Sequence, residues 1–165
     1  MTFQTGSKEY QTGFTWRDCI DKAYLATKWQ DVRDSYDRII ALRDELRPGL
    51  PIFTHSYDFA APTGAPVRLL WLPIAGGWLQ EKFEQKNIPA TMHGPIITYL
   101  LEEFAKLLDL LEDEHSEFIH IRTQGTLAKD EWGDELHPSM TGYKKIAAKF
   151  QAALQQRFPS LPSPA

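Results

Sequence analysis

Cysteine is nearly absent from this sequence of 165 residues, and an excess of positive charge is missing as well. The single thiol, Cys19, excludes an internal disulfide and a cysteine-rich zinc site, and we expect it to be a small apolar side chain on a helix. The formal net charge of -4 gives no general attraction to phosphate backbones or anionic lipid, and no basic cluster stands out. We therefore expect no nucleic-acid partner and no membrane partner.

Long apolar runs are also lacking. The uncharged stretch at residues 69–79 is interrupted by Pro73 and is far shorter than the roughly 20 residues that span a bilayer. The polar first residues lack the apolar core of a secretory signal, so we expect a cytoplasmic protein. The 42% apolar residues suffice for one globular domain, which we expect over residues 1–165 with flexible ends at 1–14 and 157–165.

Apolar spacing predicts the main elements. Long helices are expected over residues 15–46, from Gly94 and Pro95 onward, and after a cap at Ser139 or Thr141, with a shorter helix over 78–86. Proline suits a first helical turn, so the second long helix should begin at Pro95 and leave His93 in solvent. Two short β-prone runs, 51–55 and 118–121, are expected as buried strands.

The order helix, strand, helices, strand, helix is typical of an α/β fold with parallel strands. Sheets usually hold four to six strands, so a sheet of two leaves backbone groups and apolar faces uncovered. We therefore expect a partial three-layer, helix-rich fold that is completed by oligomerisation. The expected homodimer has an apolar interface built around residues 50–60 and the first helix.

The segment between the second strand and the last helix contains the pattern Asp-x-x-His, formed by Asp134 and His137. In a tight loop, such a carboxylate can bind imidazole Nδ1 and leave Nε2 free to accept a proton from a nucleophile. The same short pattern is also typical of a capping loop with solvated charges. Loops that follow parallel strands commonly carry the sites of α/β proteins.

The run WGDELHPSMTGYKKIAAKF, residues 132–150, resembles the closing block of the SGNH (GDSL-type) hydrolases. Upstream, YDRII at 36–40, RP at 47–48 and PIFTHSYDFAAP at 51–62 are similar to that family's fourth strand and the loop behind it. A bacterial branch has glycine where Ser56 stands, and GGWL at 76–79 is similar to a motif that follows in the same branch. The resemblance covers residues 30–155.

This resemblance implies a flavodoxin-like three-layer fold and a serine hydrolase without a cofactor. Asp134 would orient His137, and His137 would act as general base and then as general acid on oxygen esters of short acids. The family's nucleophile block and the two blocks that supply oxyanion donors are absent, so the chain looks like the family's carboxyl half. Removing even one such donor typically costs about 3 to 4 kcal/mol of transition-state stabilisation.

The nucleophile is therefore not evident from the sequence. Ser56 directly follows the strand expected at 51–55, which makes it the best internal candidate, although its neighbours equally indicate a hydrogen bond within a loop. Ser7 follows a glycine near the start of the chain, but no buried strand precedes it. Ser139 is interpreted as a helix cap.

Other side chains are candidates for binding. His55 ends a strand and is expected either to hydrogen-bond behind the site or to be a structural imidazole. Trp71, Trp78 and Trp132 lie in expected loops, where they would line an apolar substrate pocket or pack in a core. The five histidines show no metal-ligand spacing, so we expect no metal.

Two functions remain open from the sequence. The first is an ester hydrolase whose site is completed across a subunit interface. The second is a non-catalytic remnant, or a split piece of such a hydrolase, that acts as an assembly or binding module.

Overall fold

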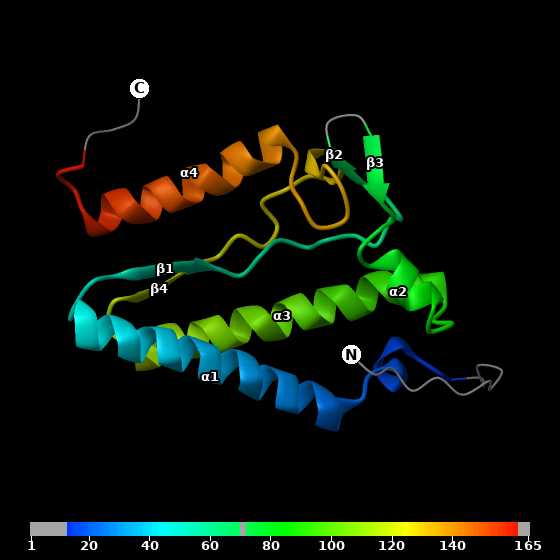
Figure 1. Ribbon diagram of the computed structural model, residues 1–165, viewed down its shortest axis with the longest axis horizontal. Coiled ribbons are helices and arrows are strands. Elements are labelled where there is room, and N and C mark those ends of the chain that lie inside the picture. Colours follow the sequence, from blue (N-terminus) through cyan, green and yellow to red (C-terminus); the bar gives the residue numbers. More distant parts are fainter. Residues whose placement is uncertain (1–12, 70–71, 162–165) are drawn as a thin grey trace.

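The computed structural model describes residues 13–69 and 72–161. A short central sheet separates two layers of helices, with α1 and α3 side by side on one face and α4 on the other (Figure 1). The protein is therefore a helix-rich mixed α/β structure, as expected from the order of its elements.

The central sheet pairs β1 (Ile52–His55) with β4 (Phe118–Ile121) in parallel. Ile52 lies opposite Phe118, and His55 lies opposite Ile121. Both strands and their parallel direction are confirmed. Within residues 13–69 and 72–161, no further strand joins this sheet, so one edge of β1 has no strand beside it.

Two of the long helices begin at side-chain caps. A short 3-10 helix, η1 (Trp16–Cys19), precedes α1 (Lys22–Leu46), where the Asp21 carboxylate accepts a hydrogen bond from the backbone N–H of Tyr24. Ser139 caps α4 (Met140–Arg157) by accepting a hydrogen bond from Gly142 N–H. The prediction of Ser139 as a cap is confirmed. The helix expected at 78–86 is the shorter α2 (Gln80–Glu84).

The expected start of the second long helix is wrong. Helix α3 (Ala90–Glu114) begins five residues before Pro95, which lies inside it. His93 is buried rather than solvated, because its ring stacks on Phe83 at 4.5 Å and its Nε2 lies 2.7 Å from the carbonyl oxygen of Ile88. These contacts hold the first turn against α2, and they outweigh the loss of one intrahelical hydrogen bond at the proline.

A second, antiparallel sheet was not predicted. It consists of β2 (Val67–Leu69) and β3 (Leu72–Ala75), with Val67 opposite Ala75. The apolar residues of 67–75 do not alternate with polar ones, and Pro73 argues against a central strand. A two-stranded hairpin accepts proline because both of its strands are edges.

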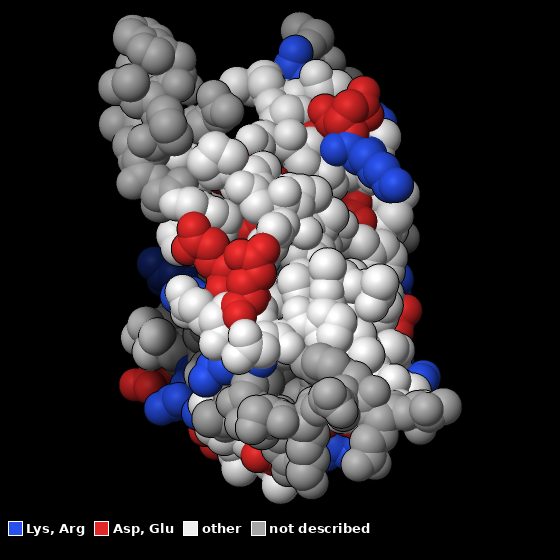
Figure 2. Space-filling view, turned by 90° about the vertical axis from the view of Figure 1, so that its right-hand side faces the viewer, with Lys and Arg blue, Asp and Glu red and all other residues white. Residues whose placement is uncertain are grey.

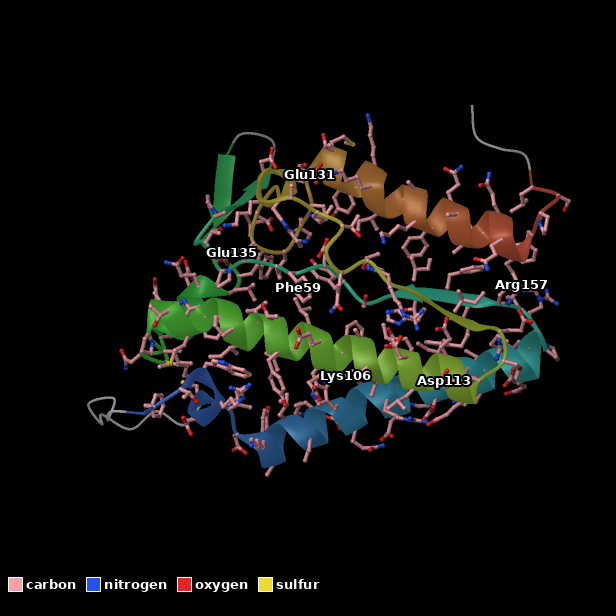
Figure 3. The ribbon with its side chains drawn as sticks, turned by 180° about the vertical axis from the view of Figure 1, so that it is seen from behind. Phe59, Lys106, Asp113, Glu131, Glu135 and Arg157 are labelled. Atoms are coloured by element: carbon pink, nitrogen blue, oxygen red, sulfur yellow. The ribbon has the colours of Figure 1, made fainter. Side chains whose placement is uncertain are left out.

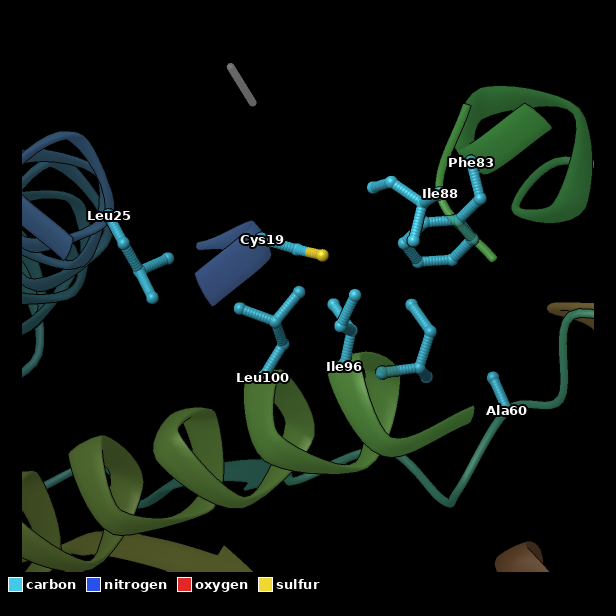
Figure 4. Packing of buried hydrophobic residues seen from close by; sticks show 8 residues of the cluster. Cys19, Leu25, Ala60, Phe83, Ile88, Ile96 and Leu100 are labelled. Carbon is cyan, nitrogen blue, oxygen red and sulfur yellow. The ribbon is translucent and has the colours of Figure 1, made fainter. Parts of the chain in front are cut away.

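Two apolar clusters form the core. The larger cluster joins η1, α1, α2 and the first half of α3, and Figure 4 shows Cys19, Leu25 and Leu100 within it. Cys19 is an apolar filler there, only 2% exposed. The smaller cluster joins α1, α3 and the sheet through Ile40, Leu108, Leu111 and Phe118.

Polar contacts tie β4 to α3. His120 Nδ1 lies 2.8 Å from Asp109 Oδ1, and the Glu112 carboxylate accepts the backbone N–H of His120 at 2.7 Å. Arg122 bridges the same two carboxylates. These contacts fix β4, the strand that precedes η2 and the loop of the candidate site in the chain.

The ends of the chain were expected to be flexible, and residues 1–12 and 162–165 lie outside the described part. Arg157 is the last residue of α4 and forms an ion pair with Glu117 at 2.9 Å. In the part of the chain that the structure describes, no helix has both the length and the apolar character to cross a membrane.

Candidate active site

The loop between η2 (Lys129–Glu131) and α4 is closed at its base. Trp132 and Pro138 form an isolated antiparallel bridge, and the carbonyl of His137 accepts the backbone N–H of Gly133 at 2.7 Å. One residue further out on each side of this bridge, the backbone N–H of Ser139 donates to the Glu131 carbonyl at 2.7 Å. Residues 132–138 are therefore held in a compact bend directly before α4.

This bend brings Asp134 and His137 together. His137 Nδ1 lies 2.9 Å from Asp134 Oδ2 and 3.0 Å from Oδ1. The His137 side chain is 52% exposed, whereas that of Asp134 is 8% exposed. No described residue forms a hydrogen bond with His137 Nε2, which leaves that nitrogen available to a ligand.

Asp134 is stabilised in its ionised form. Burial alone would raise its pKa, but hydrogen bonds from the Leu136 N–H, the His137 ring and the His137 N–H lower the pKa below its ordinary value of 3.8. An ionised Asp134 accepts from Nδ1–H. Nε2 then carries the free lone pair, which is the tautomer that a general base requires.

Glu135 lies next to Asp134 in the chain but makes different contacts, and the sequence analysis missed it. Its carboxylate is 1% exposed and accepts backbone N–H groups of Gly64 at 2.8 Å, Leu79 at 2.6 Å and Gln80 at 3.2 Å. Figure 3 shows Glu135 in the loop before α4, near the β2–β3 hairpin. This side chain joins the loop to the start of α2.

Trp78 borders the imidazole, and Tyr57 contacts the adjacent residue, Leu136. The exposed Trp78 ring packs edge-on against His137, with centroids 6.4 Å apart. The Tyr57 hydroxyl donates to the Leu136 carbonyl, and burial raises the pKa of Tyr57 to about 12. Trp132 packs against Tyr57 at 6.3 Å, on the side of the core, so of the two tryptophans proposed for binding Trp78 is the one beside the imidazole.

His55 reaches this site through Tyr57. The two rings stack at 6.0 Å, and His55 Nδ1 accepts the Tyr57 backbone N–H at 3.2 Å. Burial, with a smaller contribution from His120, lowers the pKa of His55, which favours its neutral form. These contacts fit hydrogen bonding behind the site.

Ser56 is not brought to the imidazole. Its side chain is fully buried, and its Oγ accepts the backbone N–H of Thr123 at 3.3 Å. This hydrogen bond links the residues that follow β1 and β4. Its burial fits the loop interpretation better than the role of a nucleophile.

Two candidates, Ser7 and Trp71, lie outside the described residues. Among the residues that are described, no three His, Cys, Asp or Glu side chains gather in a way that could hold a metal ion. Comparisons with models of protein families, with curated proteins and with solved structures found no match to this chain.

Glu135→Gln should destabilise the protein. The neutral amide turns N–H groups toward backbone donors, and charge-assisted hydrogen bonds contribute about 1.5–3 kcal/mol each. We expect the free energy of unfolding in urea to fall by about that amount. Glu45→Gln, at an exposed position of α1, should leave it unchanged. Equal stability of the two variants would contradict the role given to Glu135.

The Tyr57 hydroxyl should ionise at a higher pH than that of an ordinary tyrosine. Because its folded-state pKa is raised to about 12, above the ordinary 10, the stability that it contributes is complete below pH 10 and is lost as the pH rises through 12. The difference in phenolate absorbance between wild type and Tyr57→Phe reports the ionisation of Tyr57. It should develop near pH 12, in samples that circular dichroism shows to be folded. A difference that develops near pH 10 would refute this assignment.

Proposed function

We propose that this chain is an ester hydrolase of the SGNH type in which Asp134 and His137 form the acid–base pair. The observation that carries the proposal is the contact of both Asp134 carboxylate oxygens with His137 Nδ1, at 2.9 and 3.0 Å, in a His137 side chain that is half-exposed. The resemblance of residues 132–150 to that family's closing block supports the same roles.

In this mechanism, His137 Nε2 removes the proton of an attacking hydroxyl as the oxygen bonds to the ester carbonyl carbon. The resulting imidazolium is stabilised by the Asp134 carboxylate, which stays ionised. When the tetrahedral intermediate collapses, the C–O bond to the alcohol breaks, and Nε2–H returns the proton to the departing alcohol oxygen. His137 ends the step neutral.

The attacking hydroxyl comes from a water molecule or from a serine of a second copy. Ser56 is buried and bonded to Thr123 N–H, so it does not serve in this proposal. Because the blocks that supply oxyanion donors in the family are absent, a partner subunit that contributes donors would have a large effect on the rate.

His137→Ala should lower kcat/KM for p-nitrophenyl acetate by at least about 100-fold, because general acid–base catalysis contributes about 10²–10⁴-fold. Asp134→Asn should cause a comparable loss, since it removes the charge that selects the tautomer. The matched control is His115→Ala, an imidazole at the end of α3, which should keep wild-type turnover.

Turnover that is the same in wild type, His137→Ala and Asp134→Asn would refute the hydrolase. Free imidazole cleaves such esters slowly, so His115→Ala shows whether the loss of a histidine away from the pair changes turnover. Labelling of the active protein by a fluorophosphonate would identify a serine as the nucleophile. Activity without labelling would identify water.

A second candidate function is assembly, and one observation favours it. Four large apolar side chains remain exposed on α1 and the turn after it: Ile39, Leu42, Leu46 and Leu50. The three on α1 recur at intervals of three and four residues and so share one face of the helix. Leu50 continues this surface to the start of β1, whose outer edge has no described strand beside it.

We propose a homodimer through this surface and the edge of β1. Light scattering should give a mass of twice 18.9 kDa for wild type. Leu42→Glu should shift the protein toward the monomer, because it places a charge in the buried apolar interface. Leu110→Glu, at an equally exposed leucine of α3, should leave the mass unchanged. A monodisperse wild-type monomer would exclude the dimer.

A further inference from the structure

An apolar pocket of about 510 Å³ lies between α2 and α3. Trp78, Leu79 and Phe83 form one wall, and Ile97, Leu100 and Leu101 of α3 form the opposite one. This volume lies within the range of about 300–1,000 Å³ that small-molecule sites occupy. It is large enough for an organic ligand of medium size.

Two residues that line the pocket also contact the acid–base pair. Trp78 lines it and packs against the His137 ring at 6.4 Å. Leu136 lines it as well, and its backbone N–H donates to Asp134 Oδ1 at 2.8 Å. A ligand held in the pocket would therefore contact residues that border the imidazole.

Among the polar residues of the lining, Tyr57 has its hydroxyl already bonded, Lys82 and Gln85 are exposed, and Lys86 is half-buried. Tyr57 contributes its ring, and its hydroxyl is used by the Leu136 carbonyl. Lys82 and Lys86 contribute long methylene chains, and Lys82 is exposed, which keeps its charge in water. Figure 2 shows the end of the molecule on which α2 lies, where a group of acidic side chains stands near the middle of the view beside a wide uncharged area. The interior thus suits a hydrocarbon chain.

We propose that this pocket binds the acyl chain of the ester, with a preference for medium-length aliphatic chains over short acids. The inference rests on the proposed hydrolase. A methylene group occupies about as much space as a water molecule, whose share of liquid volume is about 30 Å³. A chain of eight to ten carbons therefore occupies about 240–300 Å³, roughly half of the pocket, and leaves space for the ester group on the side of Trp78 and Leu136.

A series of p-nitrophenyl esters from acetate to dodecanoate tests the preference. We expect kcat/KM to rise about fourfold for each added methylene that is buried and to level off near eight to ten carbons. Leu101→Trp fills the pocket and should lower kcat/KM at least tenfold more for the decanoate than for the acetate. Leu110→Trp makes the same substitution at an exposed position of α3 and should change neither.

Decanol binding, measured by calorimetry, tests the pocket without catalysis. The His137→Ala variant should bind decanol, and adding Leu101→Trp should abolish the heat of binding, whereas adding Leu110→Trp should not. If no ester is hydrolysed but this pattern holds, the proposed function fails and the pocket stands. If esters are hydrolysed with no dependence on chain length, or if decanol binds equally to all variants, the pocket assignment is overturned.

A second variant, which enlarges the pocket, tests the proposal even if Leu101→Trp does not fold. Leu101→Ala should move the preferred chain length upward by about two carbons, because it adds space along the chain. An unchanged preference in a folded Leu101→Ala protein would count against the proposal.

Discussion

Two consecutive buried carboxylates in one tight bend organise the candidate site. Asp134 turns inward to its own loop and binds the His137 ring, whereas Glu135 accepts the backbone N–H groups of Gly64, Leu79 and Gln80. The first contact sets the orientation of the imidazole. The second fixes the start of α2, and with it Trp78, which lies against the same imidazole and lines the apolar pocket. One short loop therefore positions both the His137 imidazole and Trp78, the residue of the pocket wall that lies beside it.

The sheet beneath this loop is small, and side-chain contacts compensate for its size. Two four-residue strands make few backbone hydrogen bonds, so the loops after β1 and β4 are joined by polar side chains instead. Ser56 accepts the Thr123 N–H, and the buried Asp58 carboxylate accepts the N–H groups of Gly125 and Leu127. Buried carboxylates that accept several backbone N–H groups are effective at fixing loops, because each such hydrogen bond is charge-assisted.

The predictable part of the fold was the part with strong periodicity. The long helices, the two central strands and their parallel direction follow from apolar spacing and element order. The start of α3 was predicted wrongly because the stacking of His93 on Phe83 outweighs the preference of proline for a first helical turn. No local sequence pattern indicates this contact. The hairpin at 67–75 lacked alternation, and its proline argued against a strand.

The candidate site also has a part that the sequence predicted and a part that it did not. Asp134 and His137 are three residues apart, so a local motif was enough to pair them. Glu135 acts on backbone groups more than fifty residues away, at Gly64, Leu79 and Gln80. Its only signal was its place beside Asp134, and an acidic residue in a polar loop is ordinarily solvated. Ser56 was singled out by its place after a strand, but position alone does not reveal whether a hydroxyl points into a cleft or into the protein.

The exposure of His137 connects the proposed dimer to the proposed activity. A half-exposed imidazole lies in a medium of high dielectric constant, where electrostatic stabilisation of a transition state is weak. A two-fold axis beside β1 would pair the two copies of this strand in antiparallel fashion, so that the start of one β1 lies beside the end of the other. The apolar surface that ends at Leu50 would then approach the partner's loops after β1, where Tyr57 contacts Leu136. Assembly would in this way exclude water from the region of the acid–base pair.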